Sequence, residues 1–102
     1  MGQLDVIALR GITAEAAHGV LEKEWDAPQT FTVDLLLWVD TDRAALSDDI
    51  VDTVSYAEIA EKAHAILVGP SVRLIETLGH KIADAALEDS RVRGVEVIVH
   101  KP

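Results

Sequence analysis

The sequence contains no cysteine, and this absence excludes three kinds of function at once. A disulfide framework, a thiolate metal site and a cysteine nucleophile all require a thiol. Basic residues are also scarce: nine lysines and arginines stand against 18 acidic residues, which gives a formal net charge of −9. Nucleic acids and anionic membranes are bound by clustered basic side chains. We therefore expect neither of them as a partner.

Long apolar runs and export signals are missing as well. No segment approaches the roughly 20 apolar residues of a membrane-spanning helix, and residues 1–5 lack the basic and apolar regions of a signal peptide. We expect a soluble, cytoplasmic protein. The 102 residues suffice for a single domain, 1–102. A domain of this size buries only about 60–65% of the surface of its unfolded chain, so oligomerisation is an expected source of further stability.

Three segments are predicted to be β-strands. Residues 4–9 form the first, and Gly11 interrupts it before residues 12–17 continue after a turn or a bulge. Residues 29–40 form the clearest strand, because apolar and polar residues alternate there. Leu36 and Trp38 break its polar face, so we expect another subunit to cover part of that face. The last predicted strand, residues 92–101, alternates in the same way.

Two longer helices are predicted between the second and third strands. Ser55 and Glu58 fit a capping box, in which each side chain satisfies an unpaired backbone N–H at the helix start. The helix that follows ends at Gly69-Pro70, as glycine and proline commonly end helices. Apolar residues at helical spacing predict a second helix from about residue 72 to 89.

The connection before these helices is predicted to hold a short helix at residues 42–49, and residues 51–54 are predicted to be extended or a loop. The resulting order is strand, strand, helix, helix, strand. Neighbouring strands with helices segregated between them are typical of an α+β fold with an antiparallel sheet.

The histidines give little support for a metal site. They stand at positions 18, 64, 80 and 100, and none belongs to a pattern such as HxH or HExxH that would indicate zinc. We expect His64 and His80 to be solvated residues on helix surfaces. The phosphate-binding patterns GxGxxG and the P-loop are absent too, so the sequence predicts neither a metal nor a nucleotide cofactor.

Four other polar residues are candidates for binding or acid–base chemistry, but each has an ordinary structural explanation. Glu24 fits a solvated loop charge, and Glu76 fits a carboxylate that complements the start of a helix. Tyr56 fits a half-buried packing residue, and Lys101 fits a charge that protects a strand edge. Individually, none of the four supports a function.

Taken together, five segments resemble the dihydroneopterin aldolase family over the whole chain. They occur in the family's order and near the family's spacing: HGVLEKE at 18–24, QTFTVDL at 29–35, SDDIVDTVSYAEI at 47–59, LIETLGHKIAD at 74–84 and VEVIVHKP at 95–102. The resemblance implies the tunnelling fold, in which two helices lie on one face of an antiparallel sheet. It also implies that sheets join across subunits into a barrel, that the protein is a homo-oligomer (a tetramer or a stacked octamer), and that active sites lie between subunits.

The resemblance further implies which residues bind the substrate. Glu76 looks like the family's pterin anchor, which accepts hydrogen bonds from the 2-amino group and the ring N3–H. Ile75 would supply a neighbouring wall or backbone contact. Val54 would pack on the pterin face.

Three residues carry over with catalytic roles. Lys101 looks like the lysine that donates and accepts protons through water. Glu24 would hold the diol side chain of the substrate and assist proton movement. Tyr56 would come from the adjacent subunit, where its hydroxyl orients the substrate or a catalytic water.

The activity implied is that of a carbon–carbon lyase of folate biosynthesis. It would cleave 7,8-dihydroneopterin by a retro-aldol reaction into 6-hydroxymethyl-7,8-dihydropterin and glycolaldehyde, without a metal, a cofactor or a lysine Schiff base. Two alternatives remain open: an epimerase of dihydroneopterin or its triphosphate on the same fold, and a non-catalytic oligomeric pterin-binding module. The family normally continues to one more strand, and we expect this last strand to be missing here.

Overall fold

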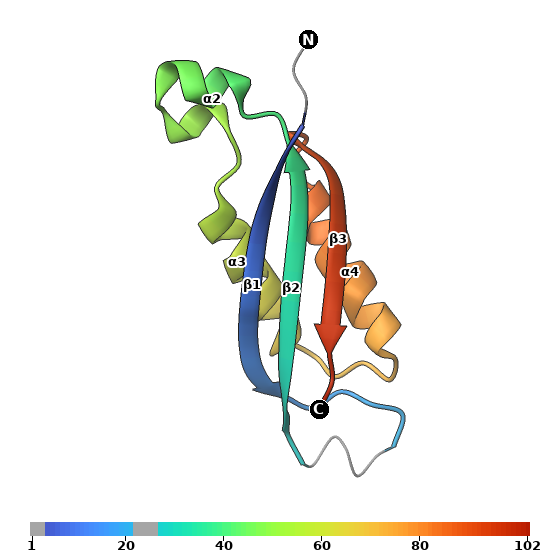
Figure 1. Ribbon diagram of the computed structural model, residues 1–102. Helices are drawn as coiled ribbons and strands as arrows, with labels where there is room; N and C mark the ends of the chain where they lie inside the picture. The colour runs from blue at the N-terminus through green and yellow to red at the C-terminus, as the bar shows by residue number, and fades with distance from the viewer. Residues whose placement is uncertain (1–3, 22–26) are drawn as a thin grey trace.

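The computed structural model describes residues 4–21 and 27–102. In chain order its elements are β1 (Asp5–Ala16), β2 (Gln29–Val39), α2 (Asp42–Ser47), the 3₁₀ helix η1 (Ile50–Asp52), α3 (Tyr56–Leu67), α4 (Ile75–Leu87) and β3 (Val92–His100). The strands form an antiparallel sheet in the order β1-β2-β3, and α3 and α4 both lie on one face of it (Figure 1). The predicted α+β class is confirmed.

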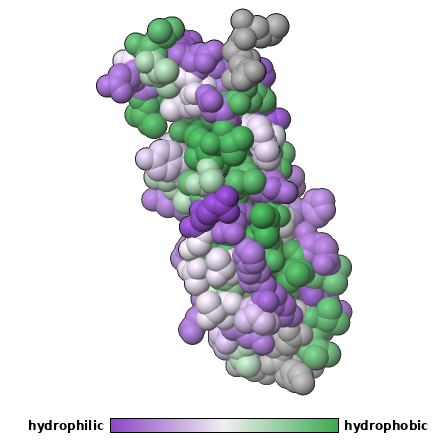
Figure 2. All heavy atoms as spheres, viewed as in Figure 1, coloured by the Kyte–Doolittle hydropathy of each residue, from purple (hydrophilic) through white to green (hydrophobic). Residues whose placement is uncertain are grey.

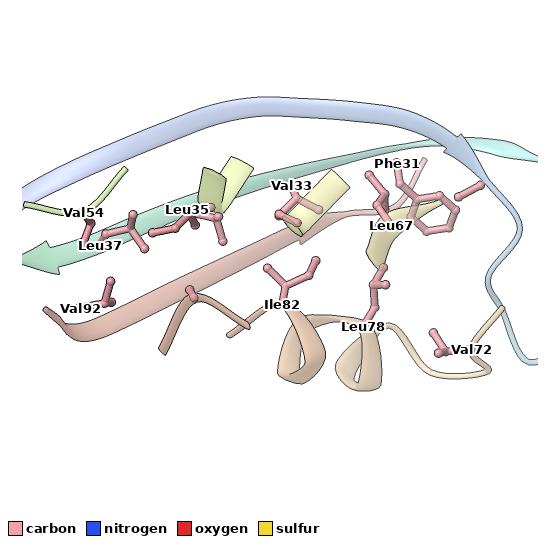
Figure 3. Close-up of a cluster of buried hydrophobic side chains, with 14 of the residues drawn as sticks. Phe31, Val33, Leu35, Leu37, Val54, Leu67, Val72, Leu78, Ile82 and Val92 are labelled. Carbon is pink, nitrogen blue, oxygen red and sulfur yellow. The ribbon is translucent and has the colours of Figure 1, made fainter. Parts of the chain in front are cut away.

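The hydrophobic core is centred on one face of β2. Side chains alternate between the two faces of a strand, and the β2 residues that point toward the helices are all fully buried: Phe31, Val33, Leu35, Leu37 and Val39. The helices oppose them with residues four apart, which share one helix face: Ile59, Ala63 and Leu67 on α3, and Leu78, Ile82 and Ala86 on α4. Figure 3 shows these side chains meeting between the sheet and the helices.

β1 is one continuous strand with a bulge at Gly11. The pairing with β2 shifts register between Leu9 and Ile12, and Gly11 has a φ of 76°, which glycine adopts without steric cost. The extra residue changes which positions face the helices: Ile7 and Leu9 before the bulge, Ile12 and Ala14 after it. The bulge therefore keeps both halves of β1 apolar on the core side.

Two predicted segments differ from the structure. Residues 51–54 were expected to be extended or a loop, but Ile50–Asp52 forms η1 because the side chain of Asp49 accepts the N–H of Val51 at 3.1 Å, a local bond that competes with extended backbone. The second long helix begins at Ile75 rather than near residue 72, because Val72 is buried and bonded to a distant loop.

The predicted start of α3 is correct. The hydroxyl of Ser55 accepts the N–H of Glu58 at 3.4 Å, and the first helical residue is Tyr56. An N-cap bond of this kind satisfies one of the unpaired donors at a helix start. The chain is thereby fixed as it passes from the buried Val54 to the exposed Tyr56.

His18 anchors the loop after β1 to the turn between α3 and α4. Its ring is only 1% exposed. Nδ1 accepts the N–H of Val72 at 3.1 Å, and Nε2 lies 2.6 Å from the carbonyl oxygen of Leu67. Because Nδ1 accepts, this pattern fits the neutral ring with its proton on Nε2, which donates to Leu67. The ring also packs edge-on against Phe31, with centroids 5.4 Å apart.

We predict that His18→Leu destabilises the protein by about 3 kcal/mol, because it leaves a buried N–H at Val72 and a buried carbonyl at Leu67 without partners. Urea unfolding followed by circular dichroism measures the change. The matched change His64→Leu, at an exposed position of α3, should stay within about 0.5 kcal/mol of the parent. Equal effects of the two substitutions would refute the anchoring role.

Candidate functional site

A pocket with a cavity volume of about 380 Å³ lies between α4 and β3. Its α4 wall is formed by Ile75, Glu76, Gly79, His80 and Ala83. The last three stand three, four and seven positions after Glu76 and therefore share one helix face with it. Its β3 wall is formed by alternate residues of the strand, Val97 and Val99. Mostly apolar walls with few polar groups are typical of sites for small organic ligands.

Glu76 is the acidic residue of this pocket. It is exposed and lies in the first turn of α4, where backbone N–H groups have no partner within the helix. The positive end of the helix dipole stabilises a carboxylate there by roughly 0.3–1 kcal/mol. Gly79 lines the pocket opposite Val99, and a methyl group in place of its hydrogen would lie 3.9 Å from Val99 Cγ2, an ordinary van der Waals distance.

Lys101 follows the last residue of β3, His100. Extended backbone alternates its side chains, so we expect Lys101 to lie on the face of Val97 and Val99, which line the pocket. The structure thus brings Ile75 and Glu76 into one pocket and ends β3 at His100, one residue past the wall residue Val99. Their predicted roles in binding and catalysis stay predictions.

The end of β3 is held from the other face of the sheet by Asp34. One carboxylate oxygen of Asp34 accepts the N–H of Gly11 at 2.8 Å, and the other lies 2.9 Å from Nε2 of His100. The N–H of Gly11 and then His100 lower the pKa of Asp34 below its usual value of 3.8, against a smaller opposing effect of burial. A single carboxylate therefore joins the bulge of β1 to the last residue of β3.

Tyr56 and Val54 lie far from the pocket in the same chain. α3 and α4 run in opposite directions (Figure 1), and the ion pair between Lys62 and Glu88, at 3.4 Å, joins the middle of α3 to the end of α4. Glu76 stands 12 residues before Glu88, about 18 Å along the helix axis. Tyr56 starts α3 beyond the other end of this span, where its side chain is 54% exposed.

Val54 is fully buried beside Leu37 (Figure 3). Its side chain faces the core of its own chain, which leaves its backbone as the part able to meet a ligand. Glu24, the remaining predicted site residue, lies outside the described residues. One chain therefore assembles only part of the predicted site, namely Ile75, Glu76 and the approach to Lys101.

His80 is a pocket residue that the sequence did not assign. We predicted it to be a solvated helix-surface residue, and it is exposed, but it lines the pocket one helical turn after Glu76. The spacing of Glu76, His80 and Ala83 on one helix face was the available signal. This spacing alone does not predict a pocket, because the opposite wall comes from β3, which is distant in the sequence.

In residues 4–21 and 27–102, no three histidine, aspartate or glutamate side chains are grouped closely enough to hold a metal ion. In the same part of the chain, no helix is long and apolar enough to cross a membrane.

The sheet, its one-sided helical layer and the pocket of Glu76 define a small α+β protein with a candidate pocket for a small organic ligand. Comparison with known proteins identifies the family of the chain. The family model described as FolB, dihydroneopterin aldolase, matches residues 7–102, and the chain belongs to this family. A dihydroneopterin aldolase of Streptomyces coelicolor is 46% identical over 99 residues, which cover 97% of this chain and 83% of the relative.

Solved structures agree with this assignment. The structure of Escherichia coli dihydroneopterin aldolase in complex with neopterin superposes with a TM-score of 0.86 at 28% identity, covering 96% of this chain and 85% of that one. A Vibrio cholerae structure superposes with a TM-score of 0.90 at 21% identity, covering 97% and 84% of the two chains. At that identity the second likeness supports the fold alone.

The Asp34 carboxylate should make folding stability depend on acid pH. Because its pKa is lower in the folded protein than its usual value of 3.8, its contribution is complete above that value and is lost as pH falls through the folded pKa. We predict that the unfolding free energy of the parent falls more steeply below about pH 4 than that of Asp34→Asn. Urea unfolding between pH 3 and 6 measures this, and Asp84→Asn, at an exposed position of α4, is the control. Parallel curves for the parent and Asp34→Asn would contradict the prediction.

Proposed function

We propose that this chain is the subunit of a dihydroneopterin aldolase that cleaves 7,8-dihydroneopterin into 6-hydroxymethyl-7,8-dihydropterin and glycolaldehyde in folate biosynthesis. The observation that carries the proposal is the pocket between α4 and β3, which holds Glu76 near the strand end that leads to Lys101. Membership of the family and the neopterin bound to the Escherichia coli relative support it. A cytoplasmic location is part of the proposal.

Glu76 would recognise the pterin ring. A carboxylate has two acceptor oxygens, which match the adjacent 2-amino group and ring N3–H of a pterin. Hydrogen bonds to a charged group contribute roughly 1.5–3 kcal/mol each. The apolar walls formed by Ile75, Val97 and Val99 would cover the flat faces of the ring.

Lys101 would serve as general acid and base through a water molecule. Removal of the proton from the 2′-hydroxyl forms the aldehyde of glycolaldehyde as the C1′–C2′ bond breaks. The bonding electrons pass into the C=N bond of the dihydropterin ring, and the resulting enamine takes a proton at C1′. Because the substrate supplies its own electron sink, the proposed reaction uses neither a metal nor a lysine Schiff base. Glu24 and Tyr56 would orient the diol side chain and the water.

A second copy of the chain would complete the site. The molecule measures 52 × 19 × 19 Å, with Tyr56 and Glu76 toward opposite ends of its helical layer, so the tyrosine can reach a pterin only from a neighbour. The sheet face away from the helices shows apolar side chains among polar ones (Figure 2): Val6 is 50% and Ile98 37% exposed. Both features support a homo-oligomer in which sheets join into a barrel.

We predict that substitution of Glu76 mainly weakens neopterin binding, whereas substitution of Lys101 mainly lowers turnover. Glu76→Gln should weaken neopterin binding about tenfold to a hundredfold, because it loses a charge-assisted pair of bonds. Lys101→Met should lower kcat by at least about a hundredfold while the Kd for neopterin changes less than about threefold. Isothermal calorimetry gives the Kd, and anaerobic assay of glycolaldehyde gives kcat.

The matched controls are Glu61→Gln and Lys81→Met, at exposed positions of α3 and α4, and both should behave like the parent. If the parent inverts the 2′ carbon but releases no glycolaldehyde, the protein is an epimerase. If it binds neopterin and converts nothing, it is a binding module. Either result would refute the proposed activity.

We predict that two variants that are inactive alone recover part of the enzymatic activity when their subunits are mixed in one oligomer. A site that takes Tyr56 from one copy and Lys101 from its neighbour is intact in about a quarter of the sites of a random 1:1 mixture of Tyr56→Ala and Lys101→Met subunits. Denaturing and refolding the variants together, and comparing turnover with that of each refolded alone, measures the recovery. No recovery in a mixture shown to contain mixed oligomers would mean that each site lies within one chain.

A further inference from the structure

The carboxylate of Asp34 bonds His100, the last residue of β3, where the strand end would otherwise fray. His100 pairs with Thr32 at the last position of the β2–β3 ladder, and strand ends fray unless they are tied down. Asp34 stands two residues further along β2, so its bond to His100 is a diagonal cross-strand contact. Because Asp34 also accepts the N–H of Gly11, the contact ties the end of β3 to both of the other strands.

This contact lies on the face of the sheet opposite the pocket. Asp34 and His100 have side chains 17% and 53% exposed on that face, whereas Val97 and Val99 line the pocket on the other. Neither member of the pair is therefore placed to touch a ligand beside Glu76. Extended backbone continued one residue past β3 would put Lys101 on the side of the pocket.

We propose that Asp34 and His100 are positioning residues that fix the end of β3 and thereby aim Lys101 at a ligand held by Glu76. This inference rests on the proposed function of Lys101. A lysine amine sits on a flexible four-carbon stem, so its reach into the pocket depends on where its backbone is fixed. A displacement of about 1 Å at a reacting group can lower a rate about a hundredfold.

The kinetic test compares His100→Leu, which removes the bond, with His100→Gln, whose amide N–H can still donate to Asp34. We expect His100→Leu to lower kcat about tenfold while KM stays within about twofold, and His100→Gln to recover most of the loss. His64→Leu, the same change at an exposed position of α3, should leave both constants unchanged. Size-exclusion chromatography and thermal melting check that each variant folds and assembles. If His100→Leu does not assemble, His100→Phe, which keeps a planar ring but cannot bond Asp34, takes its place.

A double-mutant cycle tests whether His100 acts through Lys101. In a Lys101→Met background, His100→Leu should cause no further loss of the residual kcat, because residues that act as a unit are not additive. An unchanged kcat in His100→Leu and His100→Phe, or a loss that persists fully in the Lys101→Met background, would overturn the positioning role alone. A parent protein that releases no glycolaldehyde would overturn the proposed function, and the inference with it.

Discussion

The alternation of side chains along β2 is the constraint on which the rest of the structure depends. One face of this central strand buries five apolar residues completely, which fixes α3 and α4 on that side of the sheet. The other face presents Asp34, whose carboxylate bonds both neighbouring strands. A slip of one residue in β2 would exchange these faces, exposing the core residues and turning Asp34 toward the helices. The bulge at Gly11 keeps β1 in phase with the same pattern.

The narrow shape of the subunit follows from this core and decides where a complete site can form. One sheet face covered by two antiparallel helices gives a molecule 52 Å long and 19 Å wide, in which α3 starts far from where α4 starts. Glu76 and the end of β3 lie toward one end, and Tyr56 toward the other. Association of copies would thus complete the proposed site and add buried surface to a domain too small to bury much alone.

Sequence reasoning succeeded where the signal is local and periodic. The alternation of residues 29–40 predicted β2, the Ser55–Glu58 pair predicted the start of α3, and the order of elements predicted the α+β class. It placed Glu76 at the start of a helix, and the structure adds the pocket that this carboxylate faces.

Sequence reasoning failed where the deciding contact joins residues that are distant in the sequence. No local pattern marks His18 as buried, because the groups that its ring bonds in the core, Leu67 and Val72, lie about 50 residues away. His80 reads as a solvated residue because only the packing of β3 beside α4 makes it part of a pocket. The Asp34–His100 pair spans 66 positions, and no local pattern marks either residue as supporting Lys101.

The most direct test of this account is a crystal structure of the assembled protein with neopterin bound. The account predicts one ligand per site, with its 2-amino group and N3–H on the Glu76 carboxylate, its side chain near Nζ of Lys101 in the same subunit, and the Tyr56 hydroxyl reaching it from an adjoining subunit. Neopterin bound away from Glu76, or a site in which Glu76 and Lys101 face separate regions with no cavity between them, would contradict it.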